Sequence, residues 1–129
     1  MSKKRILLVD DELLLLLSMQ RMLEDLYDIT IANGGQEAID IINKADTPFD
    51  LIITDITMPD INGANLYLYI VSKYPAMQKR IIFMTGGPLS NYLDEFFRDN
   101  KKICLEKPFE YEQLRKMIQD VFDANSVTQ

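Results

Sequence analysis

Histidine is absent from this chain of 129 residues, and cysteine occurs only once. Without histidine, the protein has no imidazole general base, no Ser-His or Cys-His catalytic pair and no histidine ligand for zinc. It also cannot carry a phosphohistidine of its own. The single cysteine, Cys104, excludes an internal disulfide and a cysteine-based metal cluster. This cysteine usage is typical of a cytosolic protein, and we expect a cytoplasmic location.

Long apolar runs and excess positive charge are missing as well. The longest apolar run, residues 13–17, is far shorter than the roughly 20 residues that cross a bilayer. The acidic segment 10–12 interrupts the apolar residues that follow the basic start, so we expect no signal peptide. The net charge of −6 argues against a surface for nucleic acids or anionic membranes. Hydrophobic residues make up 47% of the chain, which indicates one folded domain rather than disorder.

Short apolar segments alternate with segments of helical period along the chain. A continuous apolar run predicts a strand buried on both faces, whereas residues 28–32 alternate like an edge strand. Strands that alternate with helices predict an α/β fold, in which helices cover both faces of a doubly wound parallel sheet. The predicted strands are 5–9, 28–32, 50–54, 80–84 and 103–106, and the predicted helices are 12–26, 36–45, 64–74, 90–100 and 110–123.

Polar side chains follow four of the predicted strands. Asp10 and Asp11 come after the first strand, Asp55 after the third, Thr85 after the fourth and Lys107 after the last. The carboxyl ends of parallel strands lie side by side, and ligands bind at that edge of an open α/β sheet. Carboxylate oxygens are the ligands that Mg²⁺ prefers. We therefore expect a site that holds a divalent cation and a phosphoryl group together.

Each side chain of this group has a chemical role that fits such a site. Asp55 can serve as a metal ligand or as a nucleophile toward phosphorus. Lys107 can pair with phosphoryl oxygens, and the Thr85 hydroxyl can donate a hydrogen bond to another. Taken singly, these residues are more often turn formers or helix caps. Their joint placement at strand ends makes the pattern specific. The bond from Lys107 to Pro108 is also one at which a cis peptide costs little.

In combination, these motifs resemble the receiver domain of two-component response regulators. The resemblance rests on the acidic residues 10–12, the segment 51–63 around Asp55, Thr85-Gly86 and the segment 107–109. It covers residues 4–124, and we expect residues 125–129 to form a loose tail. It implies a flavodoxin-like (βα)5 fold with strand order 2-1-3-4-5.

The resemblance also implies a role for each site residue. Asp55 would be the phosphoacceptor, contacted after transfer by Lys107 and Thr85. A Mg²⁺ ion would be held by Asp10, Asp11, Asp55 and the backbone carbonyl of Thr57. Such a domain is a signalling phosphoacceptor rather than an enzyme on an external substrate. It catalyses only its own phosphorylation and dephosphorylation.

The partners implied are proteins. The donor would be a phosphohistidine on a histidine kinase or histidine phosphotransfer protein, which agrees with the lack of histidine here. Phosphorylation-dependent homodimers through the last two strands and helices are a further implication. Segments 83–87 and 104–109 are most similar to receivers attached to hybrid histidine kinases. A receiver excised from a larger protein and a stand-alone phosphorelay protein both remain open interpretations.

The sequence departs from the family pattern at one position. Cys104 occupies the place, three residues before the lysine, where the family carries an aromatic switch residue. We expect Cys104 to be a small buried strand residue, with an unreactive thiol. Thr57 and Gly87 occupy positions that tune the lifetime of the phosphoryl group in this family, and neither predicts that lifetime here.

The leucine run at residues 13–17 is too long for one helix face. At about 100° per residue, one stripe of the helix should face the sheet and the remaining leucines should point away. Those remaining leucines would be either a docking surface for the donor protein or covered by neighbouring side chains. The stripe comprises Leu15, Leu16, Met19, Met22, Leu23 and Leu26, and the leucines outside it are Leu13, Leu14 and Leu17.

Three other functions compete with the receiver interpretation. A Mg²⁺-dependent phosphohydrolase with an aspartyl-phosphate intermediate commonly has a second aspartate where this chain has Thr57. A receiver fold that is never phosphorylated would not need the intact acidic pair, Asp55, Thr85 and Lys107. A flavodoxin-like electron carrier needs a phosphate-cradling loop after the first strand, where residues 10–12 would repel phosphate.

Overall fold

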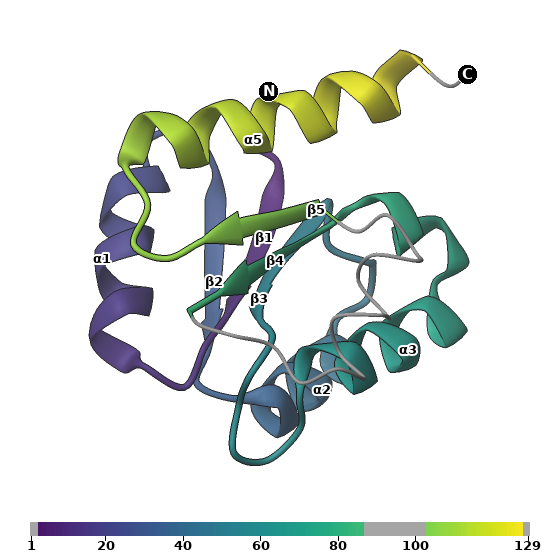
Figure 1. Ribbon diagram of the computed structural model, residues 1–129. Coiled ribbons are helices and arrows are strands. Elements are labelled where there is room, and N and C mark those ends of the chain that lie inside the picture. Colours follow the sequence, from purple (N-terminus) through teal and green to yellow (C-terminus); the bar gives the residue numbers. More distant parts are fainter. Residues whose placement is uncertain (1–2, 87–102, 128–129) are drawn as a thin grey trace.

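A computed structural model describes residues 3–86 and 103–127 of the protein. Five parallel strands form one sheet in the order β2-β1-β3-β4-β5, which confirms the predicted topology (Figure 1). The strands are β1 (Arg5–Val9), β2 (Asp28–Ala32), β3 (Leu51–Asp55), β4 (Ile81–Thr85) and β5 (Ile103–Glu106). The helices are α1 (Leu13–Leu23), α2 (Gly35–Lys44), α3 (Gly63–Lys73), the short 3-10 helix η1 (Pro75–Lys79) and α5 (Tyr111–Val127).

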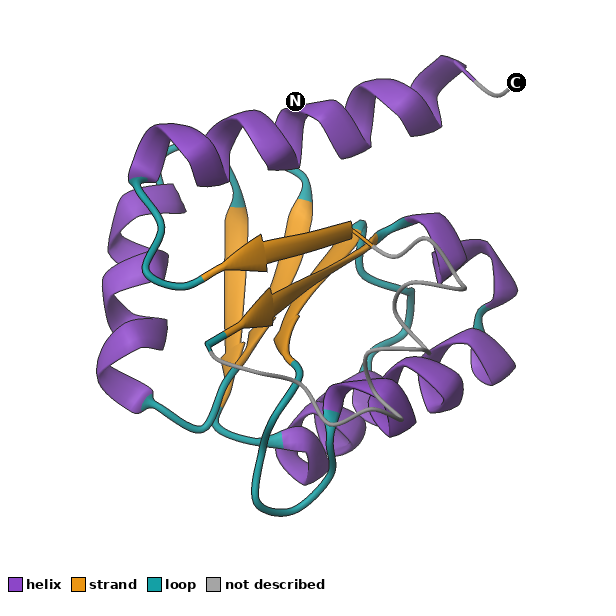
Figure 2. Cartoon of the chain, in the orientation of Figure 1, coloured by secondary structure: helices purple, strands orange, loops and turns teal. Residues whose placement is uncertain are grey.

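Helices cover both faces of the sheet (Figure 2). Successive side chains of a strand point to opposite faces, so a strand with helices on both sides must be apolar throughout. In β1, Leu7 and Val9 pack with the residues of α2 and α3, while Ile6 and Leu8 pack with those of α1 and α5. All four side chains are fully buried. The continuous apolar runs of the sequence therefore reflect a sheet between two helical layers.

The last strand differs from this pattern. In β5 only Leu105 is buried, and both Ile103 and Cys104 are exposed. The expectation of a buried strand with a buried cysteine was therefore wrong. β5 is one of the two edge strands of the sheet, paired with β4 alone among the described strands. Partial desolvation still raises the pKa of the Cys104 thiol, which disfavours the reactive thiolate.

The helix ends also depart from prediction. α5 continues through Val127, and the Asn125 side chain donates hydrogen bonds to the carbonyls of Lys79 and Val121, so residues 125–127 are not a loose tail. The 3-10 helix η1 was not predicted. The predicted helix 90–100 and the position of Gly87 lie outside the described residues. In the part of the chain that the structure describes, no helix is long and apolar enough to span a membrane.

Helix α1 buries a narrower stripe than the helical period predicted. Leu16, Met19 and Leu23 are fully buried, but Met22 and Leu26 are exposed. Leu26 is exposed because the helix ends at Leu23, and the residues after it no longer follow the helical repeat. Met22 is still within the helix, but it lies at the margin of the stripe and lines the cleft beside α1. The remaining leucines do point away from the sheet, as predicted. The exposed fractions are 48% for Leu13, 83% for Leu14 and 42% for Leu17.

Candidate functional site

Asp10 anchors the site at the carboxyl end of β1. Its backbone N–H donates to the Ala32 carbonyl, which extends the ladder between β1 and β2 by one residue. Its side chain is fully buried, and each carboxylate oxygen has a partner. Oδ1 accepts from the Glu12 backbone N–H at 2.9 Å, and Oδ2 accepts from the Lys107 ammonium at 2.8 Å. The carboxylate is therefore held in one orientation from two sides.

Asp55 is the last residue of β3, and its side chain is only 8% exposed. The neighbouring Ile56 donates its N–H to the Met84 carbonyl, so the sheet ladder continues past Asp55. The start of α3 packs directly behind this strand end. A Cβ on Gly63 would lie 2.7 Å from the Asp55 carbonyl oxygen and 2.9 Å from the Ile56 Cα. Only glycine permits that approach, and it fixes the backbone of the candidate phosphoacceptor.

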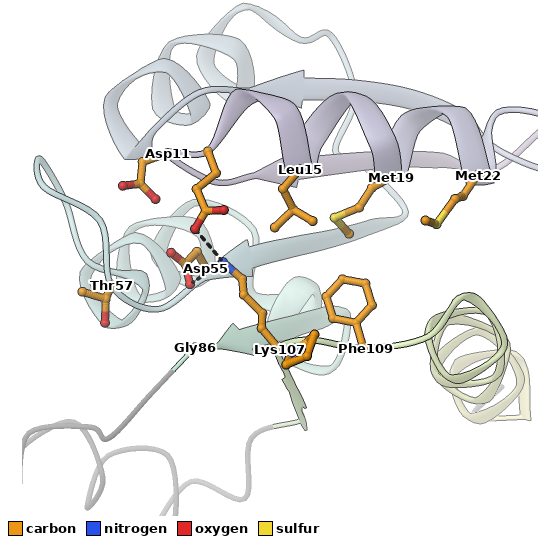
Figure 3. Close-up of a pocket in the computed structure, with 11 residues that line it drawn as sticks. Asp11, Leu15, Met19, Met22, Asp55, Thr57, Gly86, Lys107 and Phe109 are labelled. Carbon is orange, nitrogen blue, oxygen red and sulfur yellow. Dashed lines mark ion pairs between the residues drawn. The ribbon is translucent and has the colours of Figure 1, made fainter.

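Lys107 supplies the positive charge. It follows β5, where its backbone N–H donates to the Thr85 carbonyl at 2.7 Å. Its Nζ lies 2.8 Å from Asp10 and 4.0 Å from Glu12. It lies 3.5 Å from Asp55, the neighbour labelled beside it in Figure 3. Burial alone would lower the pKa of this ammonium. The hydrogen bond to Asp10 and the nearby carboxylates outweigh burial and raise the pKa, so the group remains charged.

The backbone after Lys107 turns sharply. The peptide bond between Lys107 and Pro108 is cis, and Pro108 and Phe109 line the same cleft as the lysine. A cis peptide costs little at a bond that precedes proline, as noted for this bond from the sequence.

Three carboxylates converge on the cleft. One oxygen from each of Asp10, Asp11 and Asp55 lies within 4.8 Å of the others, and this is the group among the described residues that could hold a metal ion. Around an octahedral Mg²⁺ with bonds of about 2.1 Å, ligand oxygens lie about 3.0 Å apart when adjacent and about 4.2 Å apart when opposite. All three ligand atoms are carboxylate oxygens, the type that Mg²⁺ prefers, and they are close enough together to approach one such ion.

The charge balance at Asp55 supports the same conclusion. Burial raises the pKa of Asp55 to about 6, from an ordinary value of 3.8. The negative charge of Asp10 and, less strongly, that of Asp11 add to this increase, while the Lys107 ammonium opposes it. One ammonium does not compensate three carboxylates. A divalent cation beside Asp55 would offset the remaining negative charge.

The other predicted site residues lie around this centre. Thr57 is exposed on the loop after β3 and lines the cleft together with Asp11, Asp55 and Lys107 (Figure 3). Thr85 ends β4, half-buried and next to Gly86, which also lines the cleft. The cleft continues away from the carboxylates along α1 as an apolar groove. That groove is lined by Leu15, Met19, Met22, Pro108 and Phe109.

Sequence reasoning missed two residues that support the site. The Asn33 side chain donates to the Asp10 carbonyl at 3.1 Å, and Asp60 binds the start of α2. Both stand between a predicted strand and a predicted helix, in segments for which the sequence analysis assigned no role to single residues. A turn that follows a predicted edge strand and a polar residue in a Pro/Gly-rich loop were the available signals.

Comparison with known proteins gives a consistent result. The family model of the response regulator receiver domain matches residues 6–119. Among curated proteins, the 3',5'-cyclic-nucleotide phosphodiesterase regA of Dictyostelium discoideum is 30% identical over 95% of this chain and 16% of its own length. The two-component response regulator ARR2 of Arabidopsis thaliana is 29% identical over 91% of this chain and 17% of its own length. The chain thus spans about a sixth of the length of these relatives.

Solved structures agree with the sequence comparisons. A receiver domain protein (CheY-like) from Methanospirillum hungatei superimposes with a TM-score of 0.86 and 28% identity, covering 99% of this chain and 100% of that chain. The chemotaxis protein CheY4 of Vibrio cholerae gives a TM-score of 0.79 and 26% identity, covering 93% and 99%. The sheet order and the helical layers are those of this flavodoxin-like fold. The chain belongs to the response regulator receiver domain family.

Proposed function

We propose that Asp55 accepts a phosphoryl group from a phosphohistidine on a histidine kinase or histidine phosphotransfer protein. One observation carries this proposal: the Asp55 carboxylate lies in an open cleft between the acidic pair and the Lys107 ammonium, 3.5 Å from Nζ. A nucleophile toward phosphorus needs neighbours that neutralise the charge on the phosphoryl oxygens. This chain has no histidine, so the donor imidazole must lie outside these 129 residues.

In the proposed transfer, an Asp55 carboxylate oxygen forms a bond to phosphorus as the bond from phosphorus to the donor nitrogen breaks. The electron pair of that bond goes to the imidazole nitrogen. The imidazole leaves as a neutral ring, with the proton that it already carries on its other nitrogen or with one taken up from solvent. When bound by Asp10, Asp11, Asp55 and the Thr57 carbonyl, Mg²⁺ supplies charge neutralisation and orientation.

Two side chains then engage the product. Lys107 pairs with one phosphoryl oxygen, and the Thr85 hydroxyl donates a hydrogen bond to another. In the structure Lys107 pairs most closely with Asp10, at 2.8 Å. A new anion on Asp55 competes for this ammonium, so phosphorylation redistributes the contacts between β1, β3 and β5. That redistribution is our proposed origin of the conformational switch and the change in partner binding.

The exposed leucines of α1 form the proposed docking surface for the donor. We define this α1 leucine patch as Leu13, Leu14 and Leu17. These leucines lie on the first helix after the acidic pair, and the 83% exposure of Leu14 argues against cover by neighbouring side chains. Adjacent exposed leucines are typical of a partner surface.

Charge substitutions test the patch. We expect Leu14→Asp and Leu17→Asp to slow phosphotransfer from the donor protein at least tenfold while leaving phosphorylation by acetyl phosphate unchanged. Leu68→Asp is the matched control, because Leu68 is 52% exposed on α3, which packs on the other face of the sheet. An equal loss with both donors would contradict the docking proposal.

The primary experiment is intact mass after incubation with acetyl phosphate and Mg²⁺, for the wild type beside Asp55→Ala. We expect one phosphoryl adduct on the wild type only, and no adduct when EDTA is present during the reaction. An adduct on Asp55→Ala would refute the assignment of the acceptor. If the wild type gives no adduct, beryllofluoride binding separates the two explanations: binding indicates a short-lived phosphoryl group, and lack of binding indicates a non-phosphorylated interaction module.

A further inference from the structure

The start of α2 is held by a residue from a different loop. Its N-cap, Gly34, has no side chain to accept the free backbone N–H groups of the first turn. Instead, Asp60, in the loop between β3 and α3, accepts from Gly35 N–H at 3.2 Å and from Gln36 N–H at 2.9 Å. The same carboxylate accepts from its neighbour Ile61 at 2.8 Å. Asp60 therefore binds its own loop and the helix at once.

The glycines before α2 make room for this contact. A Cβ on Gly35 would lie 2.7 Å from the Ile61 Cβ and 3.0 Å from its carbonyl oxygen. Gly34 has a φ of 128°, in the region that favours glycine, and a Cβ there would lie 3.2 Å from an Asp60 oxygen. The loop after β3 is thus pressed against the start of α2, and both glycines are required by that approach.

The same turn also contacts the first metal-ligand candidate. Asn33 donates from its side chain to the Asp10 carbonyl at 3.1 Å, and its backbone N–H donates to the Glu37 carboxylate at 3.0 Å. The segment around the α2 start is therefore hydrogen-bonded to Asp10 on one side and to the loop of Asp60 on the other. That loop begins directly after Asp55 and includes Thr57.

We propose that Asp60 is a positioning residue that fixes the loop of residues 56–62 on α2 and thereby holds the Thr57 carbonyl in place for Mg²⁺. The inference rests on the cation site of the proposed function. A helix start can be capped by a side chain at its own N-cap position. Here the cap comes from about 25 residues away, on the loop that carries a metal ligand. Backbone N–H groups donate hydrogen bonds to the Asp60 carboxylate, and the bond from Gln36 has the largest effect. These bonds lower the pKa of Asp60, so the carboxylate that caps α2 stays ionised at neutral pH.

This arrangement makes α2 responsive to the site. Because Asp60 joins loop and helix, a change in the loop when the cation binds is passed to the Gly35 and Gln36 amides. α2 then becomes an element through which occupancy of the site reaches the surface of the domain.

The test compares Mg²⁺ affinity in Asp60→Ala, Asp60→Asn and the wild type. The chain has no tryptophan, so MgCl₂ binding is measured by isothermal titration calorimetry. We expect Asp60→Ala to weaken Mg²⁺ binding about tenfold. Asp60→Asn keeps one acceptor oxygen and should restore affinity to within about threefold of the wild type. In nuclear magnetic resonance spectra, Mg²⁺ should shift the Gly35 and Gln36 amides in the wild type and leave them nearly unshifted in Asp60→Ala.

Asp50→Ala is the matched control for stability. The Asp50 carboxylate also accepts a backbone N–H, from Arg5 at 2.8 Å, but it lies at the amino ends of the strands, away from the cleft. We expect this variant to lower the melting temperature and to leave the Mg²⁺ affinity unchanged. All titrations are made at a temperature where circular dichroism shows each variant folded.

The outcomes separate the inference from the proposed function. If Asp60→Ala binds Mg²⁺ within twofold of the wild type while its melting temperature falls as in Asp50→Ala, Asp60 is only a helix cap and the inference is overturned. If the wild type binds Mg²⁺ but neither forms a phosphoryl adduct nor binds beryllofluoride, the proposed function fails and the comparison at Asp60 still stands. A wild type that binds no Mg²⁺ overturns both.

Discussion

Neutralising Asp55 should stabilise the domain when divalent cations are absent. Its pKa of about 6, against 3.8 ordinarily, means that the folded protein disfavours the ionised form. A difference of about two units, at roughly 1.4 kcal/mol each, corresponds to about 3 kcal/mol at neutral pH. The cleft is open to solvent, which screens part of this cost. We therefore expect Asp55→Asn to raise the unfolding free energy by about 1–3 kcal/mol.

The pH dependence of this gain has a defined sign. Below about pH 4, Asp55 is protonated in both the folded and the unfolded protein, so its charge has no effect. Between about pH 4 and 6 the unfolded chain releases the proton while the folded protein keeps it, so the stability of the wild type falls as pH rises. Above pH 6 the cost is constant. The advantage of Asp55→Asn should therefore be near its maximum at pH 7.5 and well under about 1 kcal/mol at pH 4.

Urea denaturation followed by circular dichroism measures these differences. Asp120→Asn is the control, because Asp120 is exposed on α5 and pairs with Lys116, at 3.0 Å. It should change stability by less than about 0.5 kcal/mol. Added Mg²⁺ at ten times its Kd should stabilise the wild type by about 1.4 kcal/mol and narrow the gap to Asp55→Asn. If Asp55→Asn is no more stable than the wild type at pH 7.5 without divalent cations, the argument is refuted.

Two further substitutions probe the support of the site. Lys107→Met removes the ammonium from the buried Asp10 carboxylate, so it should lower the unfolding free energy by about 2–4 kcal/mol without divalent cations, as measured by urea denaturation. Added Mg²⁺ should restore part of that free energy. Unchanged stability would contradict the pairing of Lys107 with Asp10. Gly63→Ala places a methyl group 2.7 Å from the Asp55 carbonyl and 2.9 Å from the Ile56 Cα, so it should cost about 1–3 kcal/mol and slow formation of the phosphoryl adduct in the mass assay. An adduct formed at the wild-type rate would show that the approach of α3 does not position Asp55.

The strands could be predicted from the sequence because each is a short apolar run bounded by polar residues. The run at 5–9 is β1 (Arg5–Val9), and the alternating segment 28–32 is β2 (Asp28–Ala32). An apolar run does not reveal whether its strand has one neighbour or two. The exposure of Cys104 in β5 was missed for this reason, since it depends on the position of that strand at the edge of the sheet. The order of the strands came from the family resemblance and not from periodicity.

The helix α1 shows a second limit. An angular count assumes that the helix continues, and it placed Met22 and Leu26 beside Leu23 on the sheet face. Leu23 is fully buried, whereas Leu26 is exposed because the helix ends at Leu23 and the chain turns toward β2. Met22 is helical but exposed, because it lies at the margin of the buried stripe. Periodicity therefore identified the face of the helix but not its length.

The meeting of the site residues was predictable to the extent that they lie at strand ends. Asp10, Asp55 and Lys107 come together because parallel strands end at one edge, and their spacing along the chain places each at such an end. Asp60 and Asn33 could not be found in the same way. Their partners are 23 to 25 residues away, and neither follows a buried strand directly. Their roles depend on how two loops meet, which no local pattern specifies.

The role of the glycines near the site becomes clear only when the positions of those two loops are known. In the sequence, Gly34, Gly35 and Gly63 mark turns, and any flexible residue would satisfy that role. In the structure, Gly35 and Gly63 stand where a Cβ would lie 2.7 Å from another segment. Gly35 lets the start of α2 approach Ile61 at the end of the loop that follows Asp55. Gly63 lets the start of α3 approach Ile56 at the beginning of that loop. Gly35 and Gly63 therefore set the distances between elements as well as the direction of the chain, and both approaches hold the loop that includes Thr57.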